Sequence, residues 1–297
     1  MASLAAHLLN PVLRYQVRRA LGKASDPAQI RKAFRTRLPV PRGVSYTAAI
    51  IGGIPGEWVE PASGARPGVT LLYLHGGAYM VCSAETHRPI TGGFARRGVR
   101  VFAANYRLAP EHPFPAAVED GLAAYRGLLE QGIAPDRLAI AGDSAGGGLA
   151  LAVLLKARDE GLPMPARIVL FSPWTDLAGT GASATENDGR DPMLVGSRIA
   201  EGAALYLNGA DATTPYASPL YGAMDGMPPM MIHVGANEVL RDDSVRLDDK
   251  ARAAGVISLL RVWPVVPHAW PIFQSLLPEG REALDAAAAF IRGALRG

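Results

Sequence analysis

The sequence has one cysteine, Cys82, among its 297 residues, so no disulfide can form within the chain. Small secreted domains usually depend on several disulfides, and this chain lacks that pattern. No apolar run reaches the length of a membrane-spanning helix, and the first ten residues, MASLAAHLLN, lack the basic region that opens a signal peptide. We therefore expect a cytoplasmic protein without a stable membrane anchor.

Charge is also sparse, since charged residues make up 19% of the chain and the net charge is only +3. The basic residues are scattered rather than gathered on one face, so we expect no nucleic-acid partner. The chain has no repeat of fixed period and no low-complexity tract, which argues against a solenoid and against a disordered chain. The hydrophobic fraction of 49% suits a globular α/β domain of ~250 residues with a small appendage.

Short apolar runs alternate with longer segments of helical periodicity from residue 69 onward, which predicts an α/β fold with a doubly wound, mostly parallel sheet of eight strands flanked by helices. The expected strands are 44–51, 57–59, 69–74, 99–104, 138–141, 168–171, 230–234 and 257–262. The main expected helices are 114–131, 145–160, 243–254 and 282–295.

Two further helices are expected before any strand. The first should begin with Asn10 as its N-cap and Pro11 as its first residue. The second should begin with Asp26 as its cap and run to Phe34. We expect this N-terminal unit, residues 1–43, to cover a site or pack on the surface of the main domain, 44–297. The polar, glycine-rich segment 176–195 should be a loop that leads into a second covering segment, and this cap insertion, at about 180–215, could complete the cover.

The pentapeptide Gly142-Asp143-Ser144-Ala145-Gly146 has the pattern G-x-S-x-G between an expected strand and an expected helix. That context is typical of a nucleophile elbow, in which a sharp turn presents the serine hydroxyl at the end of a strand. Glycines suit the turn because neighbouring backbone comes close to them. The alternative is that Ser144 merely caps a helix at a glycine-rich turn.

A nucleophilic serine needs a base and a carboxylate that orients the base. His268 follows the last expected strand, where the chain order serine, acid, histidine would place the base. Its alternative role is that of an ordinary surface histidine. For the acid, Glu238 is closest to the end of strand 230–234, whereas Asp242 and Asp243 could simply cap the next helix. Position therefore favours Glu238.

The segment His75-Gly76-Gly77-Ala78-Tyr79 ends the third expected strand. Its small residues leave backbone N–H groups able to point at a developing oxyanion, and the N–H of Ala145 could join them. We expect His75 to hold this loop by hydrogen bonds rather than to transfer protons. The remaining histidines have weaker claims: His87 lies near a helix start, and His233 lies inside an apolar strand.

Three segments together, HGGAY, GDSAGG and SPWTDL, with YRLAPEHPFPA between the first two, resemble those of the bacterial hormone-sensitive-lipase-like esterases of the α/β-hydrolase superfamily. The resemblance runs from about residue 69 to the C-terminus. It implies hydrolysis of short-chain carboxylic esters without a metal or cofactor, under a cap built from the N-terminal helices and the segment after Asp176. A homodimer is plausible by the same analogy.

The resemblance also implies roles for particular residues. Ser144 corresponds to the nucleophile, His268 to the base, and Gly76, Gly77, Ala78 and Ala145 to the oxyanion loop.

Three departures from the family pattern matter. The third glycine of the oxyanion loop is Ala78, which is acceptable if only its N–H is used. The usual aspartate of the acid loop is Glu238, so Asp242 remains an alternative acid. Pro267 restricts the backbone before His268 and could shift that ring.

Two other function classes stay open at this point. A peptidase or amidase could use the same triad on the same fold, and a ligand-binding protein could keep the scaffold without catalysis. GDSAGG also resembles the GDSGGP of trypsin-like proteases, but those enzymes are all-β and place the catalytic histidine before the serine, so we reject that class.

Overall fold

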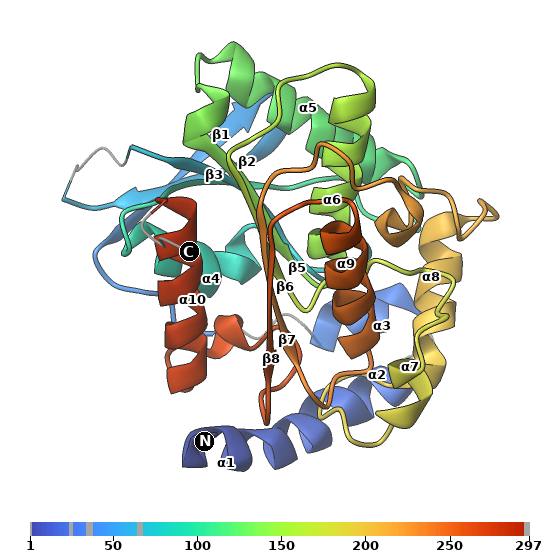
Figure 1. Cartoon of the computed structure of the whole chain (residues 1–297). Helices are drawn as coiled ribbons and strands as arrows, with labels where there is room; N and C mark the ends of the chain where they lie inside the picture. The colour runs from blue at the N-terminus through green and yellow to red at the C-terminus, as the bar shows by residue number, and fades with distance from the viewer. Residues whose placement is uncertain (1, 24–25, 34–37, 64–67, 294–297) are drawn as a thin grey trace.

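The computed structural model describes residues 2–23, 26–33, 38–63 and 68–293, and it contains an eight-stranded sheet in the order β1-β2-β4-β3-β5-β6-β7-β8 (Figure 1). β2 pairs antiparallel with β1 and with β4, and all other pairs are parallel. The strands are β1 (Val44–Ile51), β2 (Ile54–Pro61), β3 (Thr70–Leu74), β4 (Arg100–Ala104), β5 (Leu138–Asp143), β6 (Arg167–Phe171), β7 (Met230–Gly235) and β8 (Ser258–Trp263). The predicted mostly parallel sheet is confirmed.

The central strands are covered on both faces, which explains why they appear in the sequence as continuous apolar runs. Every residue of β3, β5 and β7 is buried. The edge strand β1 differs, because its outer residues alternate between exposed and half-buried positions. The continuous apolar runs of the sequence therefore correspond to strands inside the sheet.

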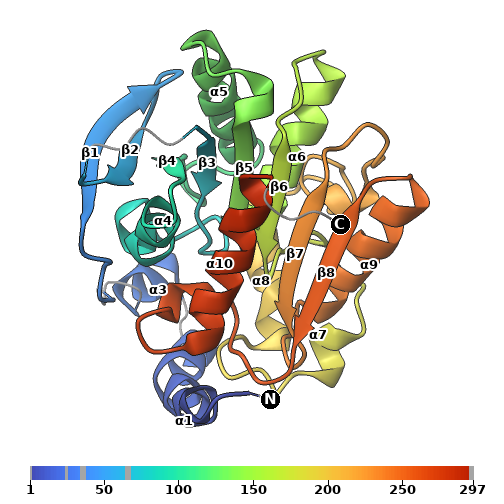
Figure 2. The ribbon, with the colours of Figure 1, turned by 60° about the vertical axis from the view of Figure 1, so that its left-hand side comes forward.

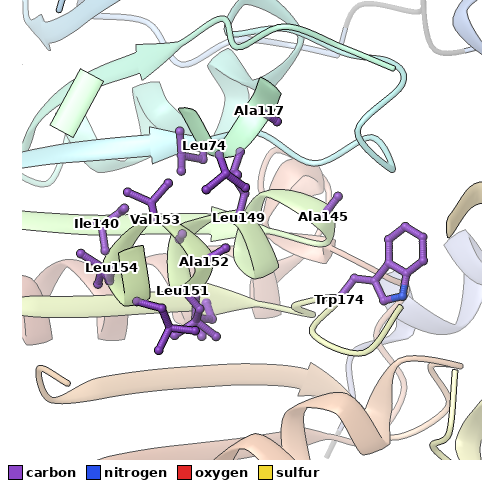
Figure 3. Close-up of a cluster of buried hydrophobic side chains, with 14 of the residues drawn as sticks. Leu74, Ala117, Ile140, Ala145, Leu149, Leu151, Ala152, Val153, Leu154 and Trp174 are labelled. Atoms are coloured by element: carbon purple, nitrogen blue, oxygen red, sulfur yellow. The ribbon is translucent and has the colours of Figure 1, made fainter. Parts of the chain in front are cut away.

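Helices cover both faces of the sheet (Figure 2). α4 and α10 pack on one face, and α5, α6 and α9 pack on the other. On the second face, Leu149 and Val153 of α6 lie against Leu74 of β3 and Ile140 of β5 (Figure 3). The helices are α1 (Leu4–Leu13), α2 (Arg19–Lys23), α3 (Pro27–Ala33), α4 (Arg88–Ala95), α5 (Ala116–Glu130), α6 (Ala145–Asp159), α7 (Ser183–Glu186), α8 (Ile199–Leu207), α9 (Arg241–Ala253) and α10 (Pro278–Ile291).

The N-terminal helices lie beside α7 and α8 at one end of the molecule (Figure 1). Side chains of α1 and α3 attach them to distant loops. Asn10 donates a hydrogen bond from Nδ2 to the carbonyl oxygen of Val265 at 3.1 Å. Arg31 donates from Nε to the carbonyl oxygen of Met80 at 2.8 Å. These bonds fix the helices over the loops that follow β3 and β8.

The prediction that the first helix begins at Asn10 is wrong. α1 begins at Leu4, with Ser3 as its N-cap, and Pro11 lies inside the helix. The Ser3 hydroxyl accepts a hydrogen bond from the N–H of Ala6, and both the N–H and the hydroxyl of Ser3 donate to the Glu279 carboxylate. A partner on α10 thus sets the start of the helix, and Asn10 serves as a tether instead of a cap.

The other predicted helix ends are closer to the structure. Asp26 accepts a hydrogen bond from the N–H of Gln29 at 2.9 Å at the start of α3, as a capping residue should, and the predicted end at Phe34 lies outside the described residues. α10 begins at Pro278, one turn before the predicted start, and the predicted end at Leu295 also lies outside them. None of the described helices is long and apolar enough to cross a membrane.

Candidate active site

Ser144 lies on the turn between β5 and α6. Its backbone has a φ of 53° and a ψ of −126°, a conformation that residues other than glycine rarely adopt. The turn is packed against backbone on both sides. A Cβ atom at Gly142 would lie 2.2 Å from the carbonyl oxygen of Gly146, and one at Gly146 would lie 2.1 Å from that of Leu74. Only glycine fits at either position, so the geometry is that of a nucleophile elbow.

A cavity of about 720 Å³ opens above this turn. Ser144 and His268 both line it, so the serine and the predicted base share one space. Most of its wall is apolar, and part of it comes from the N-terminal helices and from α8, including Val12 of α1 and Leu205 of α8. The cavity can therefore hold an apolar molecule next to the serine hydroxyl.

Glu238 orients His268 through a contact of 2.6 Å between its Oε2 and the Nδ1 of the ring. Since a carboxylate only accepts, Nδ1 carries the proton and Nε2 is left as an acceptor. The other oxygen of Glu238 accepts hydrogen bonds from the Ser172 hydroxyl and the N–H of Gly235. Pro267 does not prevent this arrangement.

The two competing carboxylates serve other segments. Asp242 accepts a hydrogen bond from the N–H of Ser183 at 2.9 Å. Asp243 is buried and accepts from the N–H groups of Thr175 and Asp176. Both aspartates connect α9 to the segment after β6, so the structure leaves Glu238 as the carboxylate that contacts His268.

His268 and Glu238 are almost completely buried. Burial alone would lower the pKa of His268, but the hydrogen bond and negative charge of Glu238, together with the charges of Asp191 and Asp143, outweigh it and raise the pKa above its usual value. A base with a raised pKa takes a proton more readily, which suits it to accept one from a hydroxyl.

The loop after β3 brings two of the predicted oxyanion donors to the cavity, since Gly77 and Ala78 line its wall. Gly77 has a φ of 115°, and Ala78 has a φ of 52° in the left-handed region that glycine adopts more easily. Ala145 is the first residue of α6, where helical N–H groups have no acceptor within the helix. Gly77 and Ala78 thus lie in the wall of the cavity that Ser144 also lines, and Ala145 directly follows Ser144 in the chain.

The assignment of Gly76 as an oxyanion donor is wrong. Its N–H donates to Oδ1 of Asp143 at 3.1 Å, and Gly76 does not line the cavity. A Cβ atom at Gly76 would lie 2.3 Å from Oδ2 of the same carboxylate, so the loop is pressed against Asp143. Gly76 thus fixes the loop rather than facing a substrate.

His75 contacts the loop after β3 and the ring of Tyr106. Its Nδ1 lies 2.8 Å from the carbonyl oxygen of Gly76, and its ring stacks on Tyr106 at 4.3 Å between centroids. Burial, and to a lesser degree the electrostatic effect of the neighbouring His87 ring, lower the pKa of His75 to about 3. A ring that stays neutral in this way acts as a support rather than as a base.

Sequence reasoning missed the carboxylate of Asp143, which stands directly before the serine. It accepts a hydrogen bond from the Tyr73 hydroxyl at 2.6 Å, and the Nε2 of His87 lies 3.3 Å away. The only signal in the sequence was a charged residue at the end of an otherwise apolar strand, because a buried carboxylate requires partners. His87 itself gave no signal.

Asp191 is a second buried carboxylate that the sequence did not reveal. Its Oδ2 accepts from the N–H of Val239, and its Oδ1 accepts from the N–H groups of Met193 and Leu194. It therefore joins the Glu238 loop to the segment that leads into α8, whose residues line the cavity.

Sheet order, elbow and buried histidine–carboxylate pair define the class of α/β hydrolases. A family model of the alpha/beta hydrolase fold matches residues 71–272. An acetyl-hydrolase of Streptomyces hygroscopicus is 46% identical over 91% of this chain and 88% of its own length. An esterase of Acinetobacter venetianus is 34% identical over 81% of this chain and 79% of its own.

Similar solved structures are esterases, which narrows the class from α/β hydrolases in general to one family. A crystal structure of EstE5 soaked with p-nitrophenyl butyrate superposes with a TM-score of 0.93 at 45% identity and covers 98% of this chain and 99% of its own. A crystal structure of an esterase from the bacterial hormone-sensitive lipase family superposes with a TM-score of 0.93 at 41% identity over 99% of both chains. This chain belongs to that family of carboxylesterases.

Proposed function

We propose that this protein hydrolyses short-chain carboxylic esters with Ser144 as nucleophile, His268 as base and Glu238 as the acid of the triad. The observation that carries the proposal is the 2.6 Å contact between Glu238 and Nδ1 of His268, made by a ring that faces the same cavity as Ser144. We also propose that residues 1–43 and about 180–215 form a cap over the active site, since α1 and α8 supply part of the cavity wall.

In the first half of the reaction, Oγ of Ser144 forms a bond to the carbonyl carbon of the ester while its proton passes to Nε2 of His268. The electron pair of the carbonyl moves to the oxygen, where the N–H groups of Gly77, Ala78 and Ala145 stabilise the negative charge. The bond to the alcohol oxygen then breaks, and that oxygen takes the proton from His268. The acyl group remains on Ser144.

Water completes the cycle with the same groups. His268 takes a proton from the water as its oxygen attacks the acyl carbon, and the second tetrahedral intermediate uses the same N–H donors. When the bond to Ser144 breaks, Oγ recovers the proton and the carboxylic acid leaves. Glu238 keeps its charge throughout and stabilises the imidazolium.

The test is the replacement Ser144→Ala, with Ser197→Ala as the control because Ser197 is an exposed serine outside the cavity wall. We expect Ser144→Ala to abolish hydrolysis of p-nitrophenyl acetate and butyrate. Intact mass should show one organophosphate adduct on the wild type and on Ser197→Ala, and none on Ser144→Ala. An unlabelled wild type would instead indicate a ligand-binding protein. Efficient cleavage of a matched amide, at a rate approaching that of the ester, would indicate a peptidase.

A small-molecule ester is the partner that an esterase of this family requires. A homodimer and a cytoplasmic location stay predictions. Sedimentation equilibrium and cell fractionation measure them.

A further inference from the structure

Gly202 stands in the middle of α8, although glycine is the poorest helix former after proline. Its φ lies outside the left-handed region, so the backbone does not require glycine. A Cβ atom at Gly202 would meet Cε of Met80 and Cη2 of Trp174, both at 3.7 Å, which are ordinary van der Waals contacts. Neither the backbone nor the packing therefore explains the glycine.

The absent side chain does leave room in the cavity. Gly202, Met80 and Trp174 all line it, and they come from three separate segments: α8, the loop after β3 and the loop after β6. Trp174 lies beyond the first turn of α6, close to Ala145 (Figure 3). The space beside Gly202 is thus an apolar part of the cavity near the elbow.

We propose that Gly202 sets the length of the unbranched alkyl chain that the site accepts. The inference rests on the proposed function and adds the substrate feature that this part of the cavity selects. A longer side chain at position 202 would extend from α8 between Met80 and Trp174 and occupy the space that the chain of the ester would take. The alkyl chain can belong to the acyl or to the alcohol side of the ester.

The experiment compares Gly202→Ala and Gly202→Leu with Ala204→Leu. Ala204 is an exposed residue of the same helix and does not line the cavity, so it controls for adding a leucine to α8. The acyl series is p-nitrophenyl acetate, butyrate and octanoate. The alcohol series is ethyl, butyl and octyl acetate. The readouts are kcat/KM for each ester and the Tm of each variant.

We expect Gly202→Leu to lower the ratio of kcat/KM for the eight-carbon ester to kcat/KM for the shortest ester by ~10-fold or more in one series. The series that responds identifies which end of the ester occupies the space. Ala204→Leu should keep the wild-type ratios. Gly202→Ala should raise Tm by about 2 °C, because alanine favours the helix and meets no clash.

Two results would overturn the inference: wild-type ratios for Gly202→Leu in both series, or a lower Tm for Gly202→Ala, which would show that packing requires the glycine. Failure of the proposed function appears separately, as a wild type that neither hydrolyses acetate nor takes an organophosphate on Ser144.

Discussion

At the scale of single residues, the site depends on buried carboxylates whose oxygens have hydrogen-bond partners. Glu238 has no exposed surface, and its two oxygens contact His268, Ser172 and Gly235. A buried charge is costly unless hydrogen bonds compensate for it. Burial raises the pKa of Glu238, and its contacts with His268 and Ser172 offset this effect only in part. The carboxylate lies directly beside the imidazole, where its charge can act on His268.

Glu238→Gln should lower kcat by up to about 10⁴-fold, the effect of the equivalent change in serine proteases. It should also change the pH profile. His268 acts as a base only when neutral, so activity falls as the pH drops through its pKa, which Glu238 helps to raise. Without that charge the pKa falls, and the acid limb of the profile moves to lower pH.

The measurement is kcat/KM against pH for wild type, Glu238→Gln and Asp242→Asn. Because Asp242 serves Ser183 and not His268, its variant should keep the wild-type acid limb. An acid limb that moved with Asp242→Asn but not with Glu238→Gln would assign the acid to Asp242.

At the scale of elements, glycines inside helices have opposite roles in α6 and α8. A Cβ atom at Gly148 in α6 would lie only 2.0 Å from the carbonyl oxygen of Trp174. The same atom at Gly202 in α8 would meet only side-chain atoms at 3.7 Å. α6 therefore needs its glycine for close approach to the loop after β6, whereas α8 does not.

Gly148→Ala should lower stability by ~1–3 kcal/mol, because moving a loop backbone costs more than the ~1 kcal/mol or less that alanine adds to a helix. Urea unfolding measures the change. Gly202→Ala is the matched control of opposite sign, and equal stabilisation by both substitutions would contradict the steric argument.

The sequence predicted the elements better than it predicted their ends. Strands buried on both faces need apolar residues at every position, so runs such as that of β3 are visible without a structure. The start of α1 is not, because Ser3 is held by Glu279, which lies 276 positions away. The role of Gly76 failed for the same reason, since its N–H partner Asp143 meets it only in the folded chain.

At the scale of the whole molecule, two buried neutral histidines couple folding to pH. His233 lies in β7 and accepts a hydrogen bond at Nδ1 from Nε1 of Trp263 at 3.0 Å. Burial and the positive charge of Arg261 lower the pKa of His233 to about 3. The pKa of His75 is also about 3. An unfolded chain binds these protons near pH 6.5, so stability must fall as the pH drops from about 6.5 towards 3.

His233→Phe should reduce this loss. The variant removes a site that contributes up to ~1.4 kcal/mol per pH unit to the slope, so its free energy of unfolding should fall less steeply below pH 6.5 than that of the wild type. At pH 8 the variant should be less stable, since Trp263 loses its acceptor.

Urea titrations at a series of pH values measure both effects. The control for replacing a histidine by phenylalanine is His112→Phe, at an exposed position outside the sheet. Parallel curves for wild type and His233→Phe would show that His233 does not contribute to acid sensitivity.

The bonds from α1 to Glu279 and Val265 also bear on how the protein is made. A ribosome releases α1 well before its anchoring partners, since Glu279 lies 276 positions after Ser3 and Val265 lies 255 positions after Asn10. The helix can therefore dock only after these later segments have been synthesised. Until then the cavity lacks the part of its wall that α1 supplies, and Ser144 is uncovered on that side in the nascent chain.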